Sequence, residues 1–405
     1  MRHTPSRLGA AYRSGRFRRL SACLCGLSLL ALAGAQTSAS KPVSDERVAY
    51  EAAVTELLQT TVAAGESPAI GAAIIRDGKL VGVSVAGVRK AGSPEPVTVD
   101  DLWHIGSCAK AMTATVLAML VEEDKLKWES TLADVFPELK DAMHADFRSV
   151  TLDQLLAHRG GIDDSKRLDL WGKMRQGGGS LTEKRLAVLR DVTAGEPHFA
   201  PGSKMMYCNL GYTIAGAMAE RVTKTDWETL IRKRLFEPLG MTSVGFGTPG
   251  ERNSVVQPMG HMEGGKKPIA VLPGPLGDNP PALAPAGTMH MSLGDWARFV
   301  SMHLDGAAGR KTLLKPESFK HMHTPRFGDE DAACGWIKLQ RPWGGNVLTH
   351  GGSNTYWYCT VWAAPEKGFA VLVTTNRGGD EYADTLDRIV SSLILDLTGE
   401  KPLPR

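Results

Sequence analysis

The chain has 405 residues, of which 42% are hydrophobic and 22% are charged, and its formal net charge is +3. This composition is that of an ordinary globular protein, and the length accommodates one large domain or two of moderate size. Six arginines and no acidic residue lie within the first 35 residues, so the rest of the chain carries a net charge of −3 and has no basic footprint for nucleic acid.

The N-terminal segment has the features of an export signal. Its arginines precede an apolar run from Leu20 to Ala35 that ends in the small residues AGA, and this pattern predicts a secretory signal peptide over residues 1–35. The run is too short and too rich in small residues for a membrane span. We therefore expect an exported, periplasmic or extracellular protein with no transmembrane span in the mature chain. The stretch LSAC leaves a lipid anchor at Cys23 as an alternative, and Arg18-Arg19 leaves twin-arginine export open.

The first part of the mature chain is predicted to form a helix, a hairpin and a second helix. Residues 36–44 are polar, and we expect a disordered linker there. Residues 45–63 place apolar side chains at helical spacing, and the runs over 69–90 predict a hairpin that turns at Asp77-Gly78. A long helix is expected to begin near Ser107.

The remainder is expected to be helical at first and strand-rich later. Residues 128–290 have a helical or loop-like pattern, and the stretch 247–287, dense in Pro and Gly, predicts long surface loops. The clearest helices in this part are 151–158, 225–240 and 291–305. Strand-like runs follow, and a last helix closes the chain; these segments are 335–340, 346–350, 356–363, 368–376 and about 380–397.

Strands at both ends of a chain, with helices between them, bury their apolar faces most economically in one sheet that both ends build. We therefore predict an α+β fold with an antiparallel sheet flanked by helices and a mostly helical inserted subdomain. Residues 45–405 are expected to form a single domain. Its sheet part comprises 45–104 and 290–405, and its helical part comprises 105–289.

The first candidate for chemistry is the sequence SCAK, from Ser107 to Lys110. Residues three apart lie on one face of a helix, so the amine can reach the hydroxyl. A serine at a helix start also has an outward-pointing backbone N–H that can stabilise an oxyanion. By spacing alone the motif is weak, because SASK repeats it at Ser38. The alternative is a helix-capping serine beside a solvated lysine.

The second candidate is Tyr207-Cys208-Asn209, on a loop that enters a helix. A free tyrosine has a pKa of about 10, and we expect the cationic Lys110 to lower it and so to favour Tyr207 as a general base. Asn209 could donate to a substrate carbonyl and accept from the lysine. The alternative is a core tyrosine followed by a capping asparagine.

The third candidate is His350-Gly351-Gly352, at the end of a predicted strand. Glycines on an edge strand let a substrate backbone approach closely. His350 could hydrogen-bond to Tyr207 or to a substrate carboxylate, and Ser353 could offer its N–H as a second oxyanion donor. The alternative is a strand that turns on two glycines, and the H-x-G spacing also occurs at residues 158–160.

These motifs, in this order, resemble the serine β-lactamase and penicillin-binding-protein superfamily, in particular its branch of class C β-lactamases, D-alanyl-D-alanine carboxypeptidases and related esterases. The resemblance extends over about residues 45–397 and includes framework stretches such as LWHIGSCAKAMTAT, RLFEPLGMTS and PAGTMHMSLGDWARF. It implies an exported serine hydrolase that cleaves an ester or an amide through an acyl-enzyme on Ser107. The alternative is a slow-turnover penicillin-binding sensor or a non-catalytic binding protein on the same fold.

The resemblance also implies a role for each residue. Lys110 and Tyr207 would share the general-base task, and Tyr207 would return the proton to the leaving group. Asn209 would hold the substrate and the lysine in place. The backbone N–H groups of Ser107 and Ser353 would form the oxyanion hole.

His350 would line the strand beside the substrate, with Gly352 two residues further on. Class C β-lactamases usually have a lysine at the position of His350, where it supports the binding of an anionic substrate. The histidine is more similar to certain carboxypeptidases and esterases of the group. Efficient β-lactam hydrolysis is therefore put in doubt, whereas acylation is not.

No cofactor and no metal is expected, and the partner is expected to be a small-molecule or peptide acyl substrate, with the oligomeric state left open. The sequence His321-Met322-His323 lacks acidic or histidine partners and is expected to be a surface loop. Four cysteines remain after the signal, and they could form two disulfides in three different pairings. They are Cys108, Cys208, Cys334 and Cys359.

Overall fold

The computed structural model describes residues 43–176, 178–264, 267–328, 331–379 and 381–399. The predicted signal peptide and Cys23 lie outside the described residues, as does most of the predicted linker. The first helix, α1, spans Val43–Ala63 and so begins two residues before its predicted start.

A six-stranded antiparallel sheet forms the centre of the fold, in the strand order β2-β1-β11-β10-β9-β8. The first two strands form the predicted hairpin, and its turn residues Asp77 and Gly78 have left-handed φ values of 49° and 73°. This conformation is typical of a tight two-residue hairpin turn. The strands span Ala69–Arg76 (β1), Lys79–Gly87 (β2), Ile337–Arg341 (β8), Gly345–Ser353 (β9), Tyr358–Ala364 (β10) and Phe369–Thr375 (β11).

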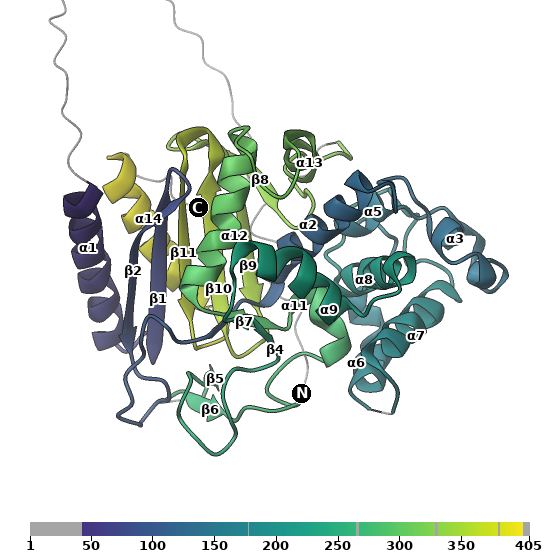
Figure 1. Cartoon of the computed structure of the whole chain (residues 1–405). Coiled ribbons are helices and arrows are strands. Elements are labelled where there is room, and N and C mark those ends of the chain that lie inside the picture. The colour runs from purple at the N-terminus through teal and green to yellow at the C-terminus, as the bar shows by residue number, and fades with distance from the viewer. Residues whose placement is uncertain (1–42, 177, 265–266, 329–330, 380, 400–405) are drawn as a thin grey trace, which may run out of the picture.

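The N-terminal hairpin joins the C-terminal strands through β1, which pairs with β11 from Ile70 opposite Thr375 to Arg76 opposite Phe369. Both ends of the chain therefore build one sheet, which confirms the predicted α+β architecture. Helices cover both faces of this sheet (Figure 1). Helix α1 and the last helix, α14 (Glu381–Thr398), lie on one face, and α12 (Leu293–Ala307) lies on the other.

The second face of the sheet also supports α2 (Ala109–Glu122), the helix that carries the first candidate motif. Twelve residues of α2 are buried, because the helix runs between the sheet and a helical lobe (Figure 1). A helix that is apolar all round belongs in a protein core. The candidate motif is therefore anchored in the interior and not on a surface helix.

The helical lobe is the insertion that the sequence predicted. Three of its helices begin with a capping box, in which the first side chain and the residue three positions on satisfy each other's backbone N–H groups; they start after Thr131, Thr151 and Ser180. The helices of the lobe are α3 (Leu132–Val135), α4 (Ala145–Arg148), α5 (Leu152–Leu156), α6 (Leu168–Arg175), α7 (Leu181–Thr193), α8 (Asn209–Thr223), α9 (Trp227–Ile231) and α10 (Glu237–Leu239).

The stretch 247–287 is less irregular than predicted. It contains a small antiparallel pair and a short helix, and a second small sheet forms from strands β3, β7 and β4. Tertiary pairing, which local composition does not reveal, orders these Pro- and Gly-rich segments. The elements are β3 (Trp103–His104), β4 (Gly245–Phe246), β5 (Gly260–Met262), β6 (Ile269–Val271), α11 (Ala284–Gly287) and β7 (Met289–Met291).

The prediction of a surface loop at residues 321–323 was wrong. His321 lies in the last turn of helix α13 (Pro316–Met322), and its Nε2 lies 2.7 Å from Asp153 Oδ1. The neighbouring His323 is buried, and its Nε2 lies 2.8 Å from Nδ1 of His303. Each histidine thus has a partner from a segment distant in sequence, which the local pattern could not show.

Within the described part of the chain, no helix combines the length and the apolar character that crossing a membrane requires.

A buried ionic cluster stabilises the helical lobe. Arg185 on α7 is 0% exposed, and its Nη2 lies 2.7 Å from Glu220 on α8 and 2.8 Å from Glu228 on α9. Removal of one partner from a buried cluster leaves an uncompensated charge in a medium that solvates it poorly.

We expect Arg185→Ala to lower the free energy of unfolding by about 3–5 kcal/mol, because two carboxylates lose their counter-ion. Urea-induced unfolding followed by circular dichroism measures this change. The matched control is Arg221→Ala, which removes an exposed ion pair with Glu138 and is expected to cost less than about 1 kcal/mol. Equal losses in the two variants would contradict a special role for the buried cluster.

Candidate active site

The candidate nucleophile stands at a sharp turn from strand to helix. Strand β3 ends at His104, and a 3-10 turn over Gly106–Cys108 leads directly into α2. Gly106 has a left-handed φ of 47°, which glycine adopts at little cost. The turn leaves Ser107 partly exposed between buried neighbours, as a reacting hydroxyl requires.

Lys110 lies one helical turn further on and is 0% exposed. Its Nζ lies 3.1 Å from Ser107 Oγ, 2.7 Å from Asn209 Oδ1 and 2.7 Å from the backbone oxygen of Ala286 in α11. Burial lowers the pKa of Lys110 to about 7, although the negative charge of Asp164 opposes the shift. The amine is therefore close to half neutral at neutral pH.

As an ammonium ion, Lys110 can donate to all three of these oxygens. The same partners also match a neutral amine. A neutral amine has two N–H donors and one lone pair. Asn209 Oδ1 and the Ala286 carbonyl can only accept, so they take the two donors. The lone pair then faces Ser107, whose hydroxyl can donate. The site is thus arranged for transfer of the serine proton to Lys110.

Tyr207 completes the group around the serine. Its hydroxyl end is close enough to Ser107 for that side chain to influence its pKa, and Lys110 Nζ lies 4.9 Å from the centre of its ring. The residue as a whole is 42% exposed, yet desolvation of its hydroxyl end raises the pKa of Tyr207. The prediction that this pKa would be lowered was wrong, because burial raises it, the negative charge of Asp164 raises it further, and the side chain of Ser107 opposes the rise only in part. Tyr207 is a proton donor at neutral pH and not a phenolate base.

His158 holds the loop that carries Tyr207. It is buried at the end of α5, with a left-handed φ of 59°, at the position after a helix where glycine is usual. Its Nδ1 accepts from the backbone N–H of Cys208 at 3.1 Å, and its ring lies 4.5 Å from the ring of Tyr207. Burial keeps the pKa of His158 well below its usual value, so the ring remains a neutral acceptor.

Asp164 fixes the start of α8 and with it Asn209. Its carboxylate accepts the backbone N–H groups of Asn209 at 2.6 Å and Leu210 at 3.2 Å, and the thiol of Cys208 donates to it at 3.0 Å. A carboxylate at a helix N-terminus satisfies unpaired N–H groups and is favoured by the helix dipole. Burial raises the pKa of Asp164, and these hydrogen bonds oppose the rise.

The strand side of the site comes from β9. In the strand order β9 is an interior strand and not the predicted edge, but its pairing with β8 ends at Thr349. The segment from His350 to Ser353 therefore pairs only with β10, which leaves its other side open toward Ser107. His350 Nδ1 lies 2.7 Å from the oxygen of Gly351, and its ring centre lies 6.4 Å from that of Tyr207.

Glycines allow the serine turn to approach β9 closely. A Cβ on Gly352 would lie 2.0 Å from the backbone oxygen of Ile105, and a Cβ on Gly106 would lie 2.3 Å from the backbone nitrogen of Ser353. Gly352 thus acts through packing and does not face a substrate. The same contact brings the N–H of Ser353 next to the turn of Ser107, so the two predicted oxyanion donors lie on neighbouring backbone segments.

The structure brings together the predicted set of Ser107, Lys110, Tyr207, Asn209 and Ser353, with His350 beside Tyr207. Sequence reasoning missed His158, Asp164 and the carbonyl of Ala286. No local signal marks these three, since each acts through a backbone contact with a segment distant in sequence.

None of the three possible disulfide pairings is formed among Cys108, Cys208, Cys334 and Cys359. All four described cysteines are free and buried. Cys108 Sγ lies 3.6 Å from Cys359 Sγ on β10, whereas Cys208 caps α8 and accepts from the N–H of Gly211 at 3.2 Å.

Outside the site around Ser107, a cluster of potential metal ligands comprises Asp153, His321 and Cys334, whose donor atoms lie within 4.8 Å of one another. Arg326 lies among them, with Nε 3.3 Å from Asp153 Oδ2 and Nη1 3.2 Å from His321 Nδ1. A guanidinium occupies the place of a cation there, so the cluster is an ion-pair network. We assign no metal to it.

The model of the Beta-lactamase family matches residues 54–393. Penicillin-binding protein 4 of Amycolatopsis lactamdurans is 29% identical over 323 residues, which cover 77% of this chain and 81% of that protein. Protein flp of Staphylococcus aureus (strain MRSA252) is 23% identical over 340 residues, which cover 82% of this chain and only 64% of flp.

Solved structures share the fold. The octameric penicillin-binding protein homologue from Pyrococcus abyssi has a TM-score of 0.70 at 24% identity, over 86% of this chain and 78% of that chain. EstCE1, a hydrolase with promiscuous acyltransferase activity, has a TM-score of 0.71 at 16% identity, over 87% of this chain and 100% of that chain. The D-amino acid amidase from Ochrobactrum anthropi SV3 has a TM-score of 0.66 at 21% identity, over 86% and 99%.

The pKa of Lys110 near 7 predicts how the reactivity of Ser107 depends on pH. The rate of acylation by an activated ester such as p-nitrophenyl acetate should fall below neutral pH with an apparent pKa of about 7, because protonation removes the lone pair that accepts the serine proton. In Tyr207→Phe this acidic limb should persist while the plateau falls by about 100-fold or more. Loss of the limb in Tyr207→Phe would return the role of base to Tyr207.

The close contact at Gly352 predicts that even a methyl group is not tolerated there. Gly352→Ala should reduce acylation strongly and lower stability by about 1–3 kcal/mol, because the added Cβ meets backbone that cannot move aside. Gly351→Ala is the control, since the nearest atom to its Cβ would be the side-chain hydroxyl of Tyr358, at 3.0 Å, and the nearest backbone atom would lie at 3.9 Å, an ordinary contact distance. Burst kinetics with the same ester and thermal unfolding measure both effects. Equal behaviour of the two variants would contradict this interpretation.

Proposed function

The chain belongs to the Beta-lactamase family, and we propose that it is a serine hydrolase that cleaves an ester or an amide through an acyl-enzyme on Ser107. The observation that carries the proposal is the buried amine of Lys110. Two oxygens that can only accept hold it, and its third contact is the nucleophile. A structural lysine needs no such arrangement and no pKa near 7.

The proposed reaction begins when Ser107 Oγ attacks the carbonyl carbon of the substrate and its proton passes to Lys110 Nζ. The N–H groups of Ser107 and Ser353 donate to the oxyanion of the tetrahedral intermediate. As the intermediate collapses, the phenol of Tyr207 gives its proton to the leaving group, and Lys110 replaces that proton. The acyl group remains on Ser107.

Water then releases the acyl group by the same path in reverse. Lys110, neutral again after acylation, accepts a proton from the water that attacks the acyl carbonyl, directly or by relay through the hydroxyl of Tyr207. The oxyanion returns to the same two donors, and Lys110 gives the proton back to Ser107. The proximity of Ser107, Lys110 and Tyr207 supports the use of the same groups in both half-reactions, so that no further acid or base is needed. Asn209 holds the lysine and also lies where it can position the substrate.

For the substrate we propose an acyl ester or a D-alanyl peptide in preference to a β-lactam. His350 stands where class C β-lactamases usually have lysine, so a permanent positive charge for an anionic substrate is missing at this position. The neighbours named as a hydrolase with promiscuous acyltransferase activity and as a D-amino acid amidase are consistent with this preference. A slow-turnover penicillin sensor would use the same acylation but would release the acyl group slowly.

A turnover panel tests the function. We expect a p-nitrophenyl ester or a D-alanyl-D-alanine peptide to be hydrolysed with many turnovers and a cephalosporin to be hydrolysed poorly. Ser107→Ala should lose at least about 1000-fold of any activity found, since the nucleophile is removed.

Time-resolved mass spectrometry of the intact protein separates the two candidates. Rapid loss of the acyl adduct indicates an enzyme, and an adduct that persists for hours indicates a sensor. Activity that survives Ser107→Ala would refute the mechanism altogether.

A further inference from the structure

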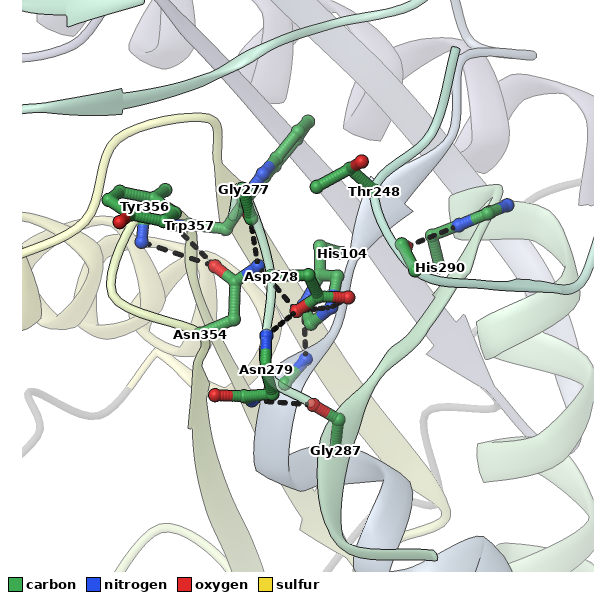
Figure 2. A network of polar contacts seen from close by, with 12 residues as sticks. His104, Thr248, Gly277, Asp278, Asn279, Gly287, His290, Asn354, Tyr356 and Trp357 are labelled. Carbon is green, nitrogen blue, oxygen red and sulfur yellow. Dashed lines mark hydrogen bonds and ion pairs between the residues drawn. The ribbon is translucent and has the colours of Figure 1, made fainter. Parts of the chain in front are cut away.

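A buried carboxylate connects the two backbone segments that would bind the oxyanion. Asp278 lies in the loop before α11 and is 5% exposed. Its oxygens accept from the side chain of Asn354 at 2.9 Å and from its neighbouring N–H of Asn279 at 2.7 Å, and His104 Nε2 lies 3.0 Å from Oδ1 and 3.1 Å from Oδ2. Figure 2 shows these groups converging on Asp278 from three separate segments.

One arm of this network reaches the serine turn. His104 is 0% exposed, and its Nδ1 accepts the backbone N–H of Gly106 at 3.1 Å. Because Nδ1 is the acceptor, the proton of the neutral ring is on Nε2, where it faces Asp278. Gly106 directly precedes Ser107 and has a left-handed φ of 47°. The orientation of the Gly106 peptide, and therefore of the next N–H, depends on this bond.

A second arm reaches the strand side. Asn354 follows Ser353 directly, and its Oδ1 accepts the N–H groups of Tyr356 and Trp357, both at 3.1 Å. These bonds close a tight turn in which Thr355 has a φ of 86°, a conformation that a β-branched residue avoids unless its surroundings impose it. Asp278 holds the amide nitrogen of Asn354 and so fixes the other end of the same side chain.

A third arm passes through the residue after Asp278. Asn279 Nδ2 donates to the backbone oxygen of Gly287 at 2.8 Å. A Cβ on Gly287 would lie 3.2 Å from the backbone nitrogen of Ser107, so this glycine packs directly beside the first oxyanion donor. The first arm therefore ends at Gly106, next to Ser107, and the second at Asn354, next to Ser353. The third ends at Gly287, which packs against the backbone nitrogen of Ser107.

We propose that Asp278 is a positioning residue that sets the two oxyanion donors, Ser107 N–H and Ser353 N–H, at their working geometry through His104 and Asn354. The inference rests on the proposed function, because it assigns the geometry of the same oxyanion hole. Asp278 does not contact the substrate. Its negative charge alone would disfavour a nearby oxyanion, so its contribution is one of orientation.

The charge of Asp278 and its orienting role predict opposite effects of removing the charge, so one substitution can distinguish them. Asp278→Asn removes a negative charge, which by electrostatics alone would favour the oxyanion. The amide nitrogen that replaces one carboxylate oxygen can only donate, so it would face the donor groups of His104 or Asn354 without accepting from them. We expect kcat for an ester to fall about 10- to 100-fold with KM within about 2-fold of the parent value, because only transition-state binding is affected. The affinity for phenylboronic acid, which forms a tetrahedral adduct with the serine, should weaken by a similar factor.

Asp295→Asn is the matched control. Asp295 is also a buried aspartate, 6% exposed, and it accepts from the N–H of Ser243 at 2.7 Å and from its hydroxyl at 2.6 Å, contacts that involve neither His104 nor Asn354. Its loss should reduce stability and leave kcat and boronate affinity near the parent values. If Asp278→Asn does not fold, Asn354→Ala, which breaks only the strand arm, carries the same measurements.

Unchanged kcat and boronate affinity in a folded Asp278→Asn or Asn354→Ala variant would overturn the inference, even if the thermal stability fell. A variant with lower stability and a changed KM, but with the kcat of the parent protein, would also overturn the inference. Failure of the proposed function is a different result: the parent protein would neither turn over the ester nor bind the boronate, or Ser107→Ala would retain both.

Discussion

The site depends on the burial of one amino group. An ammonium ion in the protein interior is costly because it loses its hydration, and the protein recovers only part of that loss through the contacts of Lys110. As a result, the pKa of Lys110 is lowered to about 7, and the amine can gain or lose a proton near neutral pH. Three elements must meet for this to happen: α2 supplies the lysine, the start of α8 supplies Asn209, and α11 supplies a backbone carbonyl.

The same constraint explains why the helical lobe is needed for chemistry that begins at the sheet. Without α8 and its cap by Asp164, Asn209 would have no fixed position, and without His158 the loop of Tyr207 would be free to move. The lobe thus contributes the proton-transfer groups, while the sheet and the strand-to-helix turn contribute the nucleophile and the anion-binding N–H groups. The candidate site residues lie where α2 runs between the sheet and the helical lobe, an arrangement of elements that Figure 1 shows.

Local pattern was enough to predict the main strands, the long helices and the α+β order, because these elements are strongly periodic. It also located Ser107, Lys110, Tyr207 and Asn209, since helical spacing and the order of motifs are properties of the chain itself. The pKa of Tyr207 was predicted with the wrong sign, because desolvation is a property of the packed interior that no sequence window contains. The partial edge of β9 follows from where β8 ends, and the roles of His158, Asp164 and Asp278 follow from contacts between segments more than 40 residues apart.

The pairing of β1 with β11 has a consequence for the order in which the molecule can assemble. Ile70 lies opposite Thr375, so the strand formed by the first part of the domain finds its partner only when nearly the whole chain is present. Contacts of such long range are slow to form, because the loop they close must first be ordered. Ser107 and Lys110 occupy a helix that can form early, whereas His350 and Ser353 come from a sheet that is completed last. The nucleophile is therefore made before the groups that would hold its oxyanion, and a nascent chain carries an incomplete site until its final strands dock.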